Sequence, residues 1–518
     1  MTKTIRILWA DDEIELLKPH ILFLEAKGYT VTAVNNGIAA VNESKQHIFD
    51  IIFLDEQMPG LSGLDTLVQI KAICPETPIV MITKSEAEDI MEAAIGSQID
   101  DYLIKPVNPN QIVLSIKKNI QQTEIITQKT TSNYQQEFSQ LGILIMQANT
   151  WDDWVEIYKK LTQWDIQLTR SKDRGMDEVL RMQHNEANTN FAKFIKKNYC
   201  NWIQSNPDDK PILSPSLIKD KVLPIIKSGR KTLLLVIDNL RYDHWVSIRP
   251  LLSEYYTMQE ESLYCSILPT STQYARNSLF AGLMPLEISK IYPDLWINDE
   301  DDEQKNQYEE SLLVSQLKRL GFTDKIYFEK ITAINPGKKV TDKIHGILQH
   351  QLSVMVYNFV DTLSHARTEM QMIKELANDE AAYRSLTISW FSHSTLFELL
   401  QELSKKQVDI IITTDHGAVR VQNPIKVVGD KNITTNLRYK QGKALVYNPK
   451  EVFEIKKPQE VSLPISHISS SYIFAAEQDF FAYPNNFNHY VQYYRDSFQH
   501  GGISMEEMII PCVYAQAK

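Results

Sequence analysis

The stretch VDIIITTDHG, residues 408–417, decides the fold of the larger part of this chain. Its run of apolar, β-branched residues predicts a buried strand. The run ends at a carboxylate and an imidazole, Asp415 and His416. In an open α/β sheet, ligands bind at the edge formed by the carboxyl ends of the strands. The stretch therefore predicts an α/β domain with a polar site at that edge.

Two further apolar runs upstream have the same character. KTLLLVIDN (231–239) leads to Asp238, and VMVYNFVDT (354–362) leads to Asp361. Both are predicted strands, and SWFSHSTLFELLQELSKK (389–406) is a predicted helix between the second run and residues 408–417. The chain after Lys231 therefore follows an α/β pattern.

The first part of the chain alternates strands and helices in the same way. Its short apolar runs are IRILWA, YTVTAV, DIIFLD, PIVMIT and DYLIKP, between residues 5 and 106. They predict a small doubly wound domain over residues 1–122. Residues 123–215 have a helical pattern and are closed by the three prolines of SNPDDKPILSPS (205–216). We therefore expect a doubly wound domain, a helical middle segment, and a large α/β domain over residues 216–518.

Composition narrows the class of protein. Of the 518 residues, 43% are hydrophobic and 23% charged, which is typical of a globular protein. The net charge of −11 argues against direct DNA binding, because a nucleic-acid surface is basic. The four cysteines form no CxxC pair, which fits a reducing cytoplasm. No apolar run approaches the roughly 20 residues of a membrane span.

Charged residues follow several strands predicted in the first domain. Asp11 and Asp12 come directly after IRILWA, Asp55 ends DIIFLD, and Lys105 ends DYLIK. Three carboxylates at one sheet edge repel one another and need a hard cation such as Mg²⁺. A carboxylate beside that cation can take a phosphoryl group, with Lys105 and the Thr83 hydroxyl as partners of the new phosphate.

This arrangement resembles the receiver domain of response regulators over about residues 5–122, a domain with a flavodoxin-like fold. The run DEQMPGLSGLDTL after DIIFL matches the phosphorylation loop of that family. The alternative is a set of loop residues in another flavodoxin-like domain. The resemblance implies that Asp55 accepts the phosphoryl group and that Thr83 and Tyr102 form the switch pair. It also implies that Lys105 contacts the phosphate and that Mg²⁺ is held by Asp11, Asp12, Asp55 and the Gln57 carbonyl.

The candidate ligands of the large domain each have a plainer explanation. Asp238 ends a predicted strand, but taken alone it is better explained as a helix N-cap. Thr272 lies in LPTSTQYARNSLFAG, where a loop enters a helix whose N-terminus favours phosphate. Thr270 and Ser271 are equally eligible as the cap of that helix.

The remaining candidates are two histidines and a carboxylate. Asp361 and His365 are four residues apart, so one helical turn places them on the same face. A surface helix pair would have the same spacing. His500 is followed by two glycines, which let backbone approach an ion closely, although a lone loop histidine is commonly just exposed.

Together these residues form a mixed oxygen and nitrogen set suited to zinc. Their order resembles the alkaline phosphatase superfamily, and most closely its PglZ branch, over about residues 225–518. The resemblance implies two zinc ions and hydrolysis of a phosphoric diester, with Thr272 as the nucleophile. One ion would be held by Asp238, Thr272, Asp415 and His416, and the other by Asp361, His365 and His500.

Two arginines are candidates for a contact with the substrate phosphate. Arg276 lies one helical turn beyond Thr272, and Arg438 lies in NLRYK. By base rate, each is better explained as a surface or structural arginine. No ligand set for a third metal is evident, which favours a diester over a monoester. A nucleotide or short oligonucleotide diester is the substrate that the superfamily implies.

The combination of these domains resembles the response regulators of the type IX protein secretion system. That resemblance implies a sensor histidine kinase as partner and contact with a sigma factor. We hypothesise that phosphorylation of Asp55 drives a symmetric homodimer to which the helical middle segment contributes. The alternatives are a passive spacer and a non-catalytic regulator that binds proteins and whose zinc site is structural or ligand-sensing.

Overall fold

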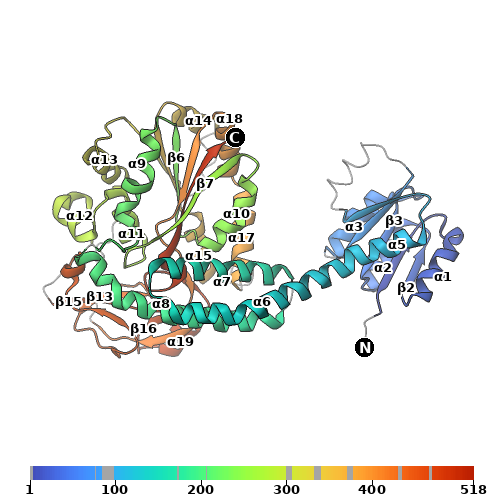
Figure 1. Ribbon diagram of the computed structural model, residues 1–518, viewed down its shortest axis with the longest axis horizontal. Coiled ribbons are helices and arrows are strands. Elements are labelled where there is room, and N and C mark those ends of the chain that lie inside the picture. Colours follow the sequence, from blue (N-terminus) through green and yellow to red (C-terminus); the bar gives the residue numbers. More distant parts are fainter. Residues whose placement is uncertain are drawn as a thin grey trace. The chain divides into compact units, whose positions relative to one another are not determined.

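The computed structural model describes residues 4–75, 77–84, 99–171, 174–205, 207–298, 306–331, 340–369, 377, 379–429, 434–465 and 469–518. The chain divides into two compact units (Figure 1), the first of residues 1–135 and the second of residues 136–170 and 174–518. In the described part of the chain, no helix combines the length and the apolarity needed to cross a membrane. The expected division at residues 122 and 215 remains a prediction.

The first unit is a parallel sheet flanked by helices, as expected. Its strand order is β2-β1-β3-β4-β5, and every neighbouring pair is parallel. The strands are β1 (Arg6–Ala10), β2 (Thr30–Val34), β3 (Ile51–Asp55), β4 (Ile79–Thr83) and β5 (Asp101–Ile104). The helices are α1 (Lys18–Ala26), α2 (Gly37–Gln46), α3 (Gly63–Ile73) and α5 (Pro109–Ile116).

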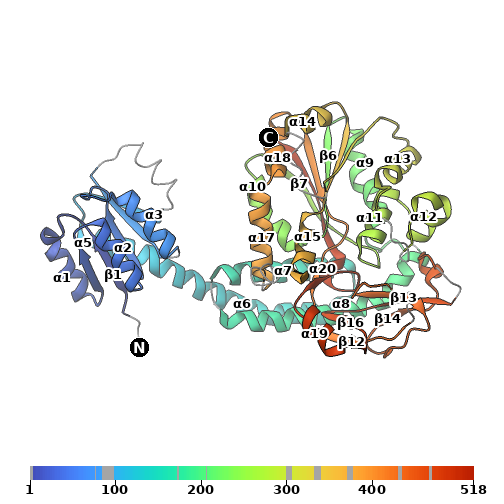
Figure 2. The ribbon, with the colours of Figure 1, turned by 180° about the vertical axis from the view of Figure 1, so that it is seen from behind.

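Helices cover both faces of this sheet (Figure 2). Side chains of α2 and α3 pack with Leu8 and Leu54, whereas those of α1 and α5 pack with Trp9 and Phe53. Since consecutive residues of a strand point to opposite faces, these alternating contacts bury both faces. The polar residues are thereby left to the carboxyl ends of the strands.

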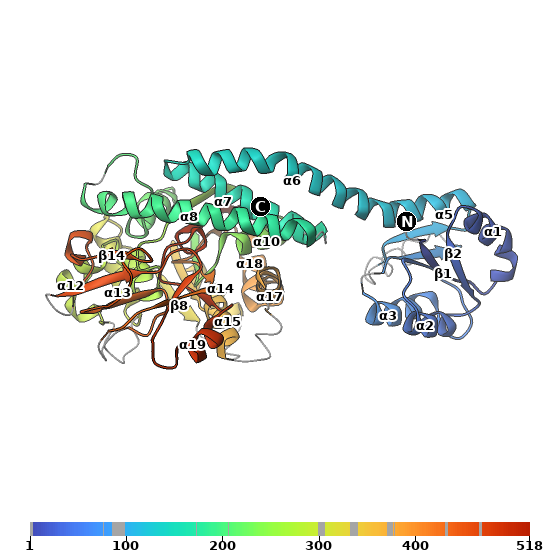
Figure 3. The same cartoon turned by 90° about the horizontal axis from the view of Figure 1, so that it is seen from below.

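Long helices form the middle segment. A π-helical turn, η2 (Lys117–Gln121), joins α5 to α6 (Gln122–Gln147), so the expected helical continuation is confirmed. α7 (Trp151–Ser171) and α8 (Arg174–Gln204) follow and run side by side (Figure 3). Aromatic contacts join them: the Trp151 and Trp202 rings lie 6.2 Å apart, and Trp154 contacts Phe191 at 5.6 Å.

The second unit is built on a mixed sheet with strand order β7-β18-β10-β6-β9-β8. The three predicted strands are β6 (Thr232–Ile237), β9 (Leu352–Tyr357) and β10 (Asp409–Thr413). The pattern analysis missed β7 (Tyr256–Cys265), β8 (Tyr327–Ile331) and β18 (Ile509–Ala517). β18 runs antiparallel to both of its neighbours, β10 and β7.

Helices cover the two faces of this sheet in two groups (Figures 1 and 2). On one face lie α10 (Tyr242–Leu252), α14 (Val340–Leu348), α17 (Glu380–Ser392) and α18 (Thr395–Lys405). On the other lie α9 (Leu223–Lys227), α11 (Thr272–Ala281) and α13 (Glu309–Arg319). α12 (Pro285–Ile291) follows α11, and α15 (Phe359–Glu369) follows β9.

The single helix predicted over residues 389–406 is wrong. α17 ends at Ser392 and α18 begins at Thr395. Ser394 has extended backbone and its hydroxyl accepts a hydrogen bond from the Phe397 N–H at 3.1 Å. Serine is a favoured N-cap, so this residue ends one helix and starts the next.

Small sheets surround the turn that carries His500. β11 (Val419–Arg420) pairs with β17 (Phe498–Gln499), directly before that histidine. The others are β12 (Asn423–Lys426) with β16 (Asp479–Ala482), and β13 (Tyr439–Lys443), β15 (Ser470–Phe474) and β14 (Phe453–Ile455). α19 (Phe487–Tyr494) and α20 (Met505–Met508) flank the turn in sequence.

Candidate functional site

The carboxyl ends of β1, β3 and β5 bring four charged side chains together in the first unit. One ligand atom each from Asp11, Asp12 and Asp55 lies within 4.8 Å of the others. The Lys105 ammonium lies 2.9 Å from carboxylate oxygens of both Asp11 and Asp55. Burial raises the pKa of Asp55, and the Asp11 carboxylate adds to this while Lys105 opposes it. A hard cation such as Mg²⁺ fits this oxygen-only set.

The other predicted residues of this unit lie around the same edge. The Thr83 hydroxyl, at the end of β4, donates to the carboxylate of Glu56, a residue that the sequence analysis did not single out. Tyr102 on β5 is 44% exposed. Gln57 is exposed two residues beyond Asp55. The proposed phosphate, switch and metal roles of these residues remain predictions.

A first cluster of the second unit lies at the carboxyl ends of β6 and β10. Asp238, Asp415 and His416 each offer a ligand atom within 4.8 Å of the others. Asp238 is not a helix N-cap, because α10 begins only at Tyr242. Thr272 is the first residue of α11, after the Ser271 N-cap. Its hydroxyl oxygen lies 3.1 Å from Nε2 of His416 and 3.5 Å from Oδ1 of Asp238.

A buried guanidinium compensates the carboxylates of this cluster. Arg276 is 1% exposed and lies 2.9 Å from Oδ2 of Asp238 and 2.9 Å from Glu309. Burial raises the pKa of Asp238 well above its ordinary range, although Arg276 opposes the shift. The pKa of Asp415 is lowered in spite of burial, because His416 and Arg276 outweigh it.

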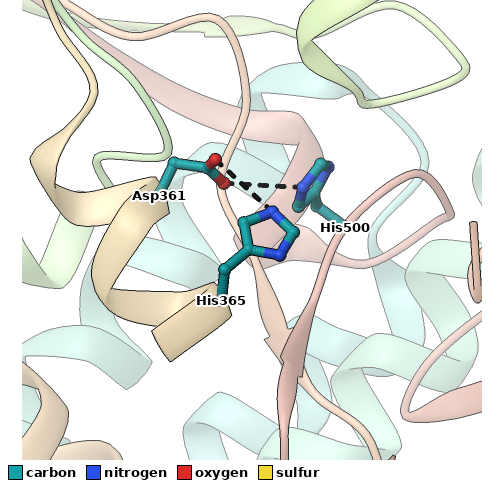
Figure 4. Close-up of side chains that lie close together, drawn as sticks. All are labelled: Asp361, His365 and His500. Carbon is teal, nitrogen blue, oxygen red and sulfur yellow. Dashed lines mark ion pairs between the residues drawn. The ribbon is translucent and has the colours of Figure 1, made fainter. Parts of the chain in front are cut away.

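A second cluster consists of Asp361, His365 and His500 (Figure 4). Asp361 and His365 share one face of α15, as their spacing predicts, and Nε2 of His365 lies 3.5 Å from Oδ2 of Asp361. His500 enters from the turn after β17, with Nε2 3.6 Å from Oδ1 of Asp361. Both imidazoles point toward the Asp361 carboxylate. His500 is 12% exposed and His365 59%, so only the latter lies open.

The glycines after His500 allow this approach. Gly501 has φ +123°, and a Cβ on Gly502 would lie 2.4 Å from the Ala475 carbonyl oxygen. A larger residue at either position would therefore displace the turn. The approach of this backbone to an ion, which the two glycines predict, remains a prediction.

The two clusters adjoin to form one site. The rings of His416 and His500 stack with centroids 4.2 Å apart. Asn239, directly after Asp238, donates to Oδ1 of Asp361 at 3.4 Å. The structure therefore gathers all seven predicted residues of the large domain: Asp238, Thr272, Asp361, His365, Asp415, His416 and His500.

The donor sets of both clusters fit divalent cations. In the described residues Oδ2 of Asp415 is buried without a hydrogen-bond partner, so an acceptor is left for an ion. Burial lowers the pKa of His500 well below its usual value, and the two neighbouring histidines add to this. The imidazole is thus neutral, as metal binding requires. Mixed nitrogen and oxygen donors suit zinc.

The surroundings of Arg438 favour the structural role over the candidate contact with the substrate. Arg438 is 0% exposed, and its Nη2 lies 2.6 Å from Oε2 of Glu507. Its other nitrogens donate to Glu507 again and to the carbonyls of Ala476 and Asp479. The guanidinium is therefore held by the protein itself, which corresponds to the structural alternative.

Some polar residues of the site were missed by the sequence analysis. Asn358, which lies 3.4 Å from Arg276, directly follows β9, so the strand-end rule could have found it, as it could Asn239. Glu309 begins α13 and is fixed by Arg276 and by Lys330, at 3.1 Å. Nothing local in the sequence around Glu309 signals that role.

Comparison with known families agrees with the presence of one site in the first unit and another in the second. Residues 7–117 match the response regulator receiver domain, and residues 124–203 match the PorX response regulator linker domain. Residues 217–515 match the BREX system PglZ alkaline phosphatase-like domain. Fold and sites therefore define a response regulator with an alkaline phosphatase-like output domain. Because that last match covers more than half of the chain, the chain belongs to the PglZ alkaline phosphatase-like family, with the domain order of PorX-type response regulators.

Individual relatives match only part of the chain. The transcriptional regulatory protein ZraR of Klebsiella oxytoca is 28% identical over 138 residues, 27% of this chain and 31% of ZraR. ResD of Bacillus subtilis (strain 168) is 30% identical over 145 residues, 27% of this chain and 60% of ResD. This chain thus spans less than two thirds of either relative.

Among solved structures, a CheY-like receiver domain protein from Methanospirillum hungatei JF-1 is 23% identical. It covers 23% of this chain and 96% of its own, with a TM-score of 0.23.

Proposed function

We propose that this response regulator is a phosphoric diester hydrolase whose nucleophile is Thr272 and whose two clusters hold zinc. The observation that carries the proposal is the position of the Thr272 hydroxyl. Thr272 begins α11, and its hydroxyl faces Asp238 and His416, whose ring stacks on His500 of the second cluster. Backbone N–H groups at a helix N-terminus favour a phosphate and a developing negative charge.

The chemistry begins with in-line attack of the Thr272 oxygen on phosphorus. A new O–P bond forms while the bond to the leaving group breaks. The hydroxyl proton passes to solvent, and the departing alkoxide takes a proton from solvent and leaves as the alcohol. Water then hydrolyses the phosphothreonine ester and restores Thr272. Divalent cations, when bound, would offset charge on the phosphoryl oxygens and favour ionisation of the hydroxyl.

Arg276 favours a diester substrate in this proposal. Its guanidinium lies between Asp238, Glu309 and, at 3.8 Å, Asp415. A further cation beside Asp238 would have to displace that fixed positive charge. A diester carries one negative charge fewer than a fully ionised monoester, so two cations suffice to neutralise its transition state. A nucleotide or short oligonucleotide diester is the proposed substrate class.

The first unit supplies the proposed control. Asp55 is the proposed phosphoacceptor, with Mg²⁺ held by Asp11, Asp12 and Asp55, and a sensor histidine kinase is the proposed donor. The PorX-type domain order supports a role in type IX protein secretion. A sigma factor is a further proposed partner.

Hydrolysis of bis-p-nitrophenyl phosphate by zinc-loaded protein tests the enzymatic part. We expect Thr272→Ala to lower kcat by at least about 10³-fold, as loss of a nucleophile does elsewhere. The matched control is Thr395→Ala. Thr395 also begins a helix, α18, and this helix gives no residue to either cluster. The control should keep the wild-type rate.

Zinc content, measured on the same samples, separates the outcomes. About two zinc ions per chain in the wild type, with a rate that collapses only in Thr272→Ala, supports the proposal. Equal rates per bound zinc in wild type and Thr272→Ala would contradict it. Two zinc ions without any turnover would favour a binding regulator with a structural metal site.

A further inference from the structure

Helix α17 carries two adjacent buried side chains, Tyr383 and Arg384, that belong to neither cluster. Adjacent residues of a helix point in directions about 100° apart, so the two contact different parts of the molecule. Tyr383 is 0% exposed and Arg384 4%. The function proposed above assigns neither of them a role.

Tyr383 contacts both chain segments that supply the second cluster. Its hydroxyl donates to the Val360 carbonyl at 3.2 Å, and Val360 directly precedes Asp361. Its ring stacks on Phe498, two residues before His500, with centroids 4.1 Å apart and planes 21° apart. One side chain thus fixes α15 and the turn after β17 relative to each other.

Arg384 contacts the helical segment. Nη1 lies 2.5 Å from Oδ2 of Asp165 on α7, and Nη2 donates to the Thr169 hydroxyl at 3.3 Å. Nη1 also lies 3.2 Å from Oδ2 of Asp243 on α10, which in turn pairs with Arg241 at 2.9 Å. A cavity of about 730 Å³, lined by Asp165 among others, lies beside these charged side chains. α17 is therefore tied to α7 by charge-assisted bonds next to an open space.

We propose that Tyr383 is a positioning residue for the metal ion of the second cluster, and that Arg384 makes this positioning depend on helix α7. The proposal rests on the function proposed above and adds to it a route by which the helical segment acts on the site. A displacement of α7 moves Arg384, hence α17 and Tyr383. The spacing of Asp361 and His500 then changes.

The physical reason is the precision that a metal site demands. Ligands must be held within about 0.5 Å of productive geometry by side chains that are themselves fixed. Residues behind the ligands typically change metal affinity 10–100-fold when they are lost. His365 is largely exposed, so Asp361 and His500 define the rigid part of the second cluster.

Zinc affinity of the second cluster alone is the direct measurement. The full chain with Asp415→Asn weakens the first cluster while leaving His416 stacked on His500, and zinc is titrated against a competing chelator. We expect Tyr383→Phe in this background to weaken zinc binding about 10-fold. The matched control is Tyr256→Phe, which also removes a buried hydroxyl that donates to a carbonyl, that of Leu400 at 2.8 Å.

The link to α7 needs its own pair of variants. Asp165→Asn removes the negative charge that Arg384 contacts on α7, and we expect a 3- to 10-fold loss of zinc affinity at the second cluster. Glu137→Gln is the control. It changes a carboxylate on α6 that is 30% exposed, against 38% for Asp165, and breaks the pair of Glu137 with Lys160 on α7, at 3.0 Å. Only Asp165→Asn should move the zinc affinity.

The outcomes distinguish this inference from the proposed function. Zinc affinity unchanged in Tyr383→Phe, or lowered equally in Tyr256→Phe, overturns the positioning role while leaving the hydrolase intact. Equal effects of Asp165→Asn and Glu137→Gln overturn the link to α7. No zinc at the second cluster in a chain with native Tyr383 removes the proposed function itself.

Discussion

At the scale of single residues, His244 on α10 is buried, and its polar ring atoms make no hydrogen bond among the described residues. It is 0% exposed, and within the described residues neither ring nitrogen has a hydrogen-bond partner. Its ring meets the Tyr383 ring edge-on at 4.9 Å. Burial lowers its pKa to about 3, with Asp243 opposing and Arg241 and Arg384 adding to the shift. The imidazole is therefore neutral in the folded protein.

This side chain makes stability depend on pH in a defined direction. The unfolded histidine takes up a proton near pH 6.5 and the folded one only near pH 3. Its stabilising contribution is complete above about pH 6.5 and is lost as the pH falls from there toward 3. Replacement by an aromatic ring that cannot titrate removes this loss.

We therefore expect His244→Phe to gain stability relative to the wild type on acidification. Between pH 7.5 and 5.5 the difference in unfolding free energy should shift toward the variant by about 1.4 kcal/mol. Urea unfolding of both proteins at the two pH values checks this. If the difference is the same at both pH values, burial does not lower the pKa of His244 in the folded chain.

The candidate ligands could be predicted from the sequence, whereas the residues that hold those ligands in place could not. Asp238 and Asp415 follow apolar runs, and Asp361 and His365 share a helical spacing. These local rules made them candidates, and the family resemblance joined them into one site. Tyr383 and Arg384 show no local signal, because their roles come from packing between segments far apart in sequence. Arg438 illustrates the same limit, since its partner Glu507 is 69 residues away.

At the scale of secondary-structure elements, the pair of Arg438 and Glu507 joins β13 to the turn that carries His500. Arg438 directly precedes β13, and Glu507 lies in α20 and accepts a hydrogen bond from the Gly502 N–H at 2.8 Å. Both side chains are fully buried. Loss of one partner leaves a buried charge uncompensated, which is more costly than loss of both.

A double-mutant cycle measures the coupling between Arg438 and Glu507. Arg438→Met alone should lower the unfolding free energy by about 3–5 kcal/mol. Combined with Glu507→Met it should cost clearly less than the sum of the two single changes. Urea unfolding gives the free energies, and KM for the diester, measured on the zinc-loaded fraction, should stay unchanged. A rise in KM in Arg438→Met would instead support the candidate contact of this residue with the substrate phosphate.

Element prediction succeeded where the pattern was local. The strands of the first unit, the helix at Thr272 and the continuation through residues 122–147 all have strong periodicity or clear boundaries. The division between α17 and α18 was missed because Ser394 sits in a sequence that is otherwise helical. β18 was missed because it contains Pro511, which is uncommon inside a sheet.

At the scale of the whole molecule, phosphorylation of Asp55 is expected to change the association state. Addition of beryllofluoride and Mg²⁺, which mimic the phosphoryl group, should raise the molar mass by light scattering from 59.8 kDa to roughly twice that value. Asp55→Asn should stay at the lower mass. Asp65→Asn, which alters an exposed carboxylate at the start of α3, is the control and should respond like the wild type.

One mass in both states would remove the dimer switch and leave the helical segment as an internal connector. The families of the first and the last domain could be predicted from short motifs. The position of the unit boundary could not, because α6 crosses it as one uninterrupted helix.

The strand order of the large sheet has a consequence for how the protein is made. β18 occupies an interior position between β7 and β10, yet the ribosome delivers it after every other strand of that sheet. Until then two long edges stay unpaired, and such edges invite aggregation. The sheet of the second unit can therefore be completed only after β18 has been made, so messages cut short before this strand should yield inclusion bodies.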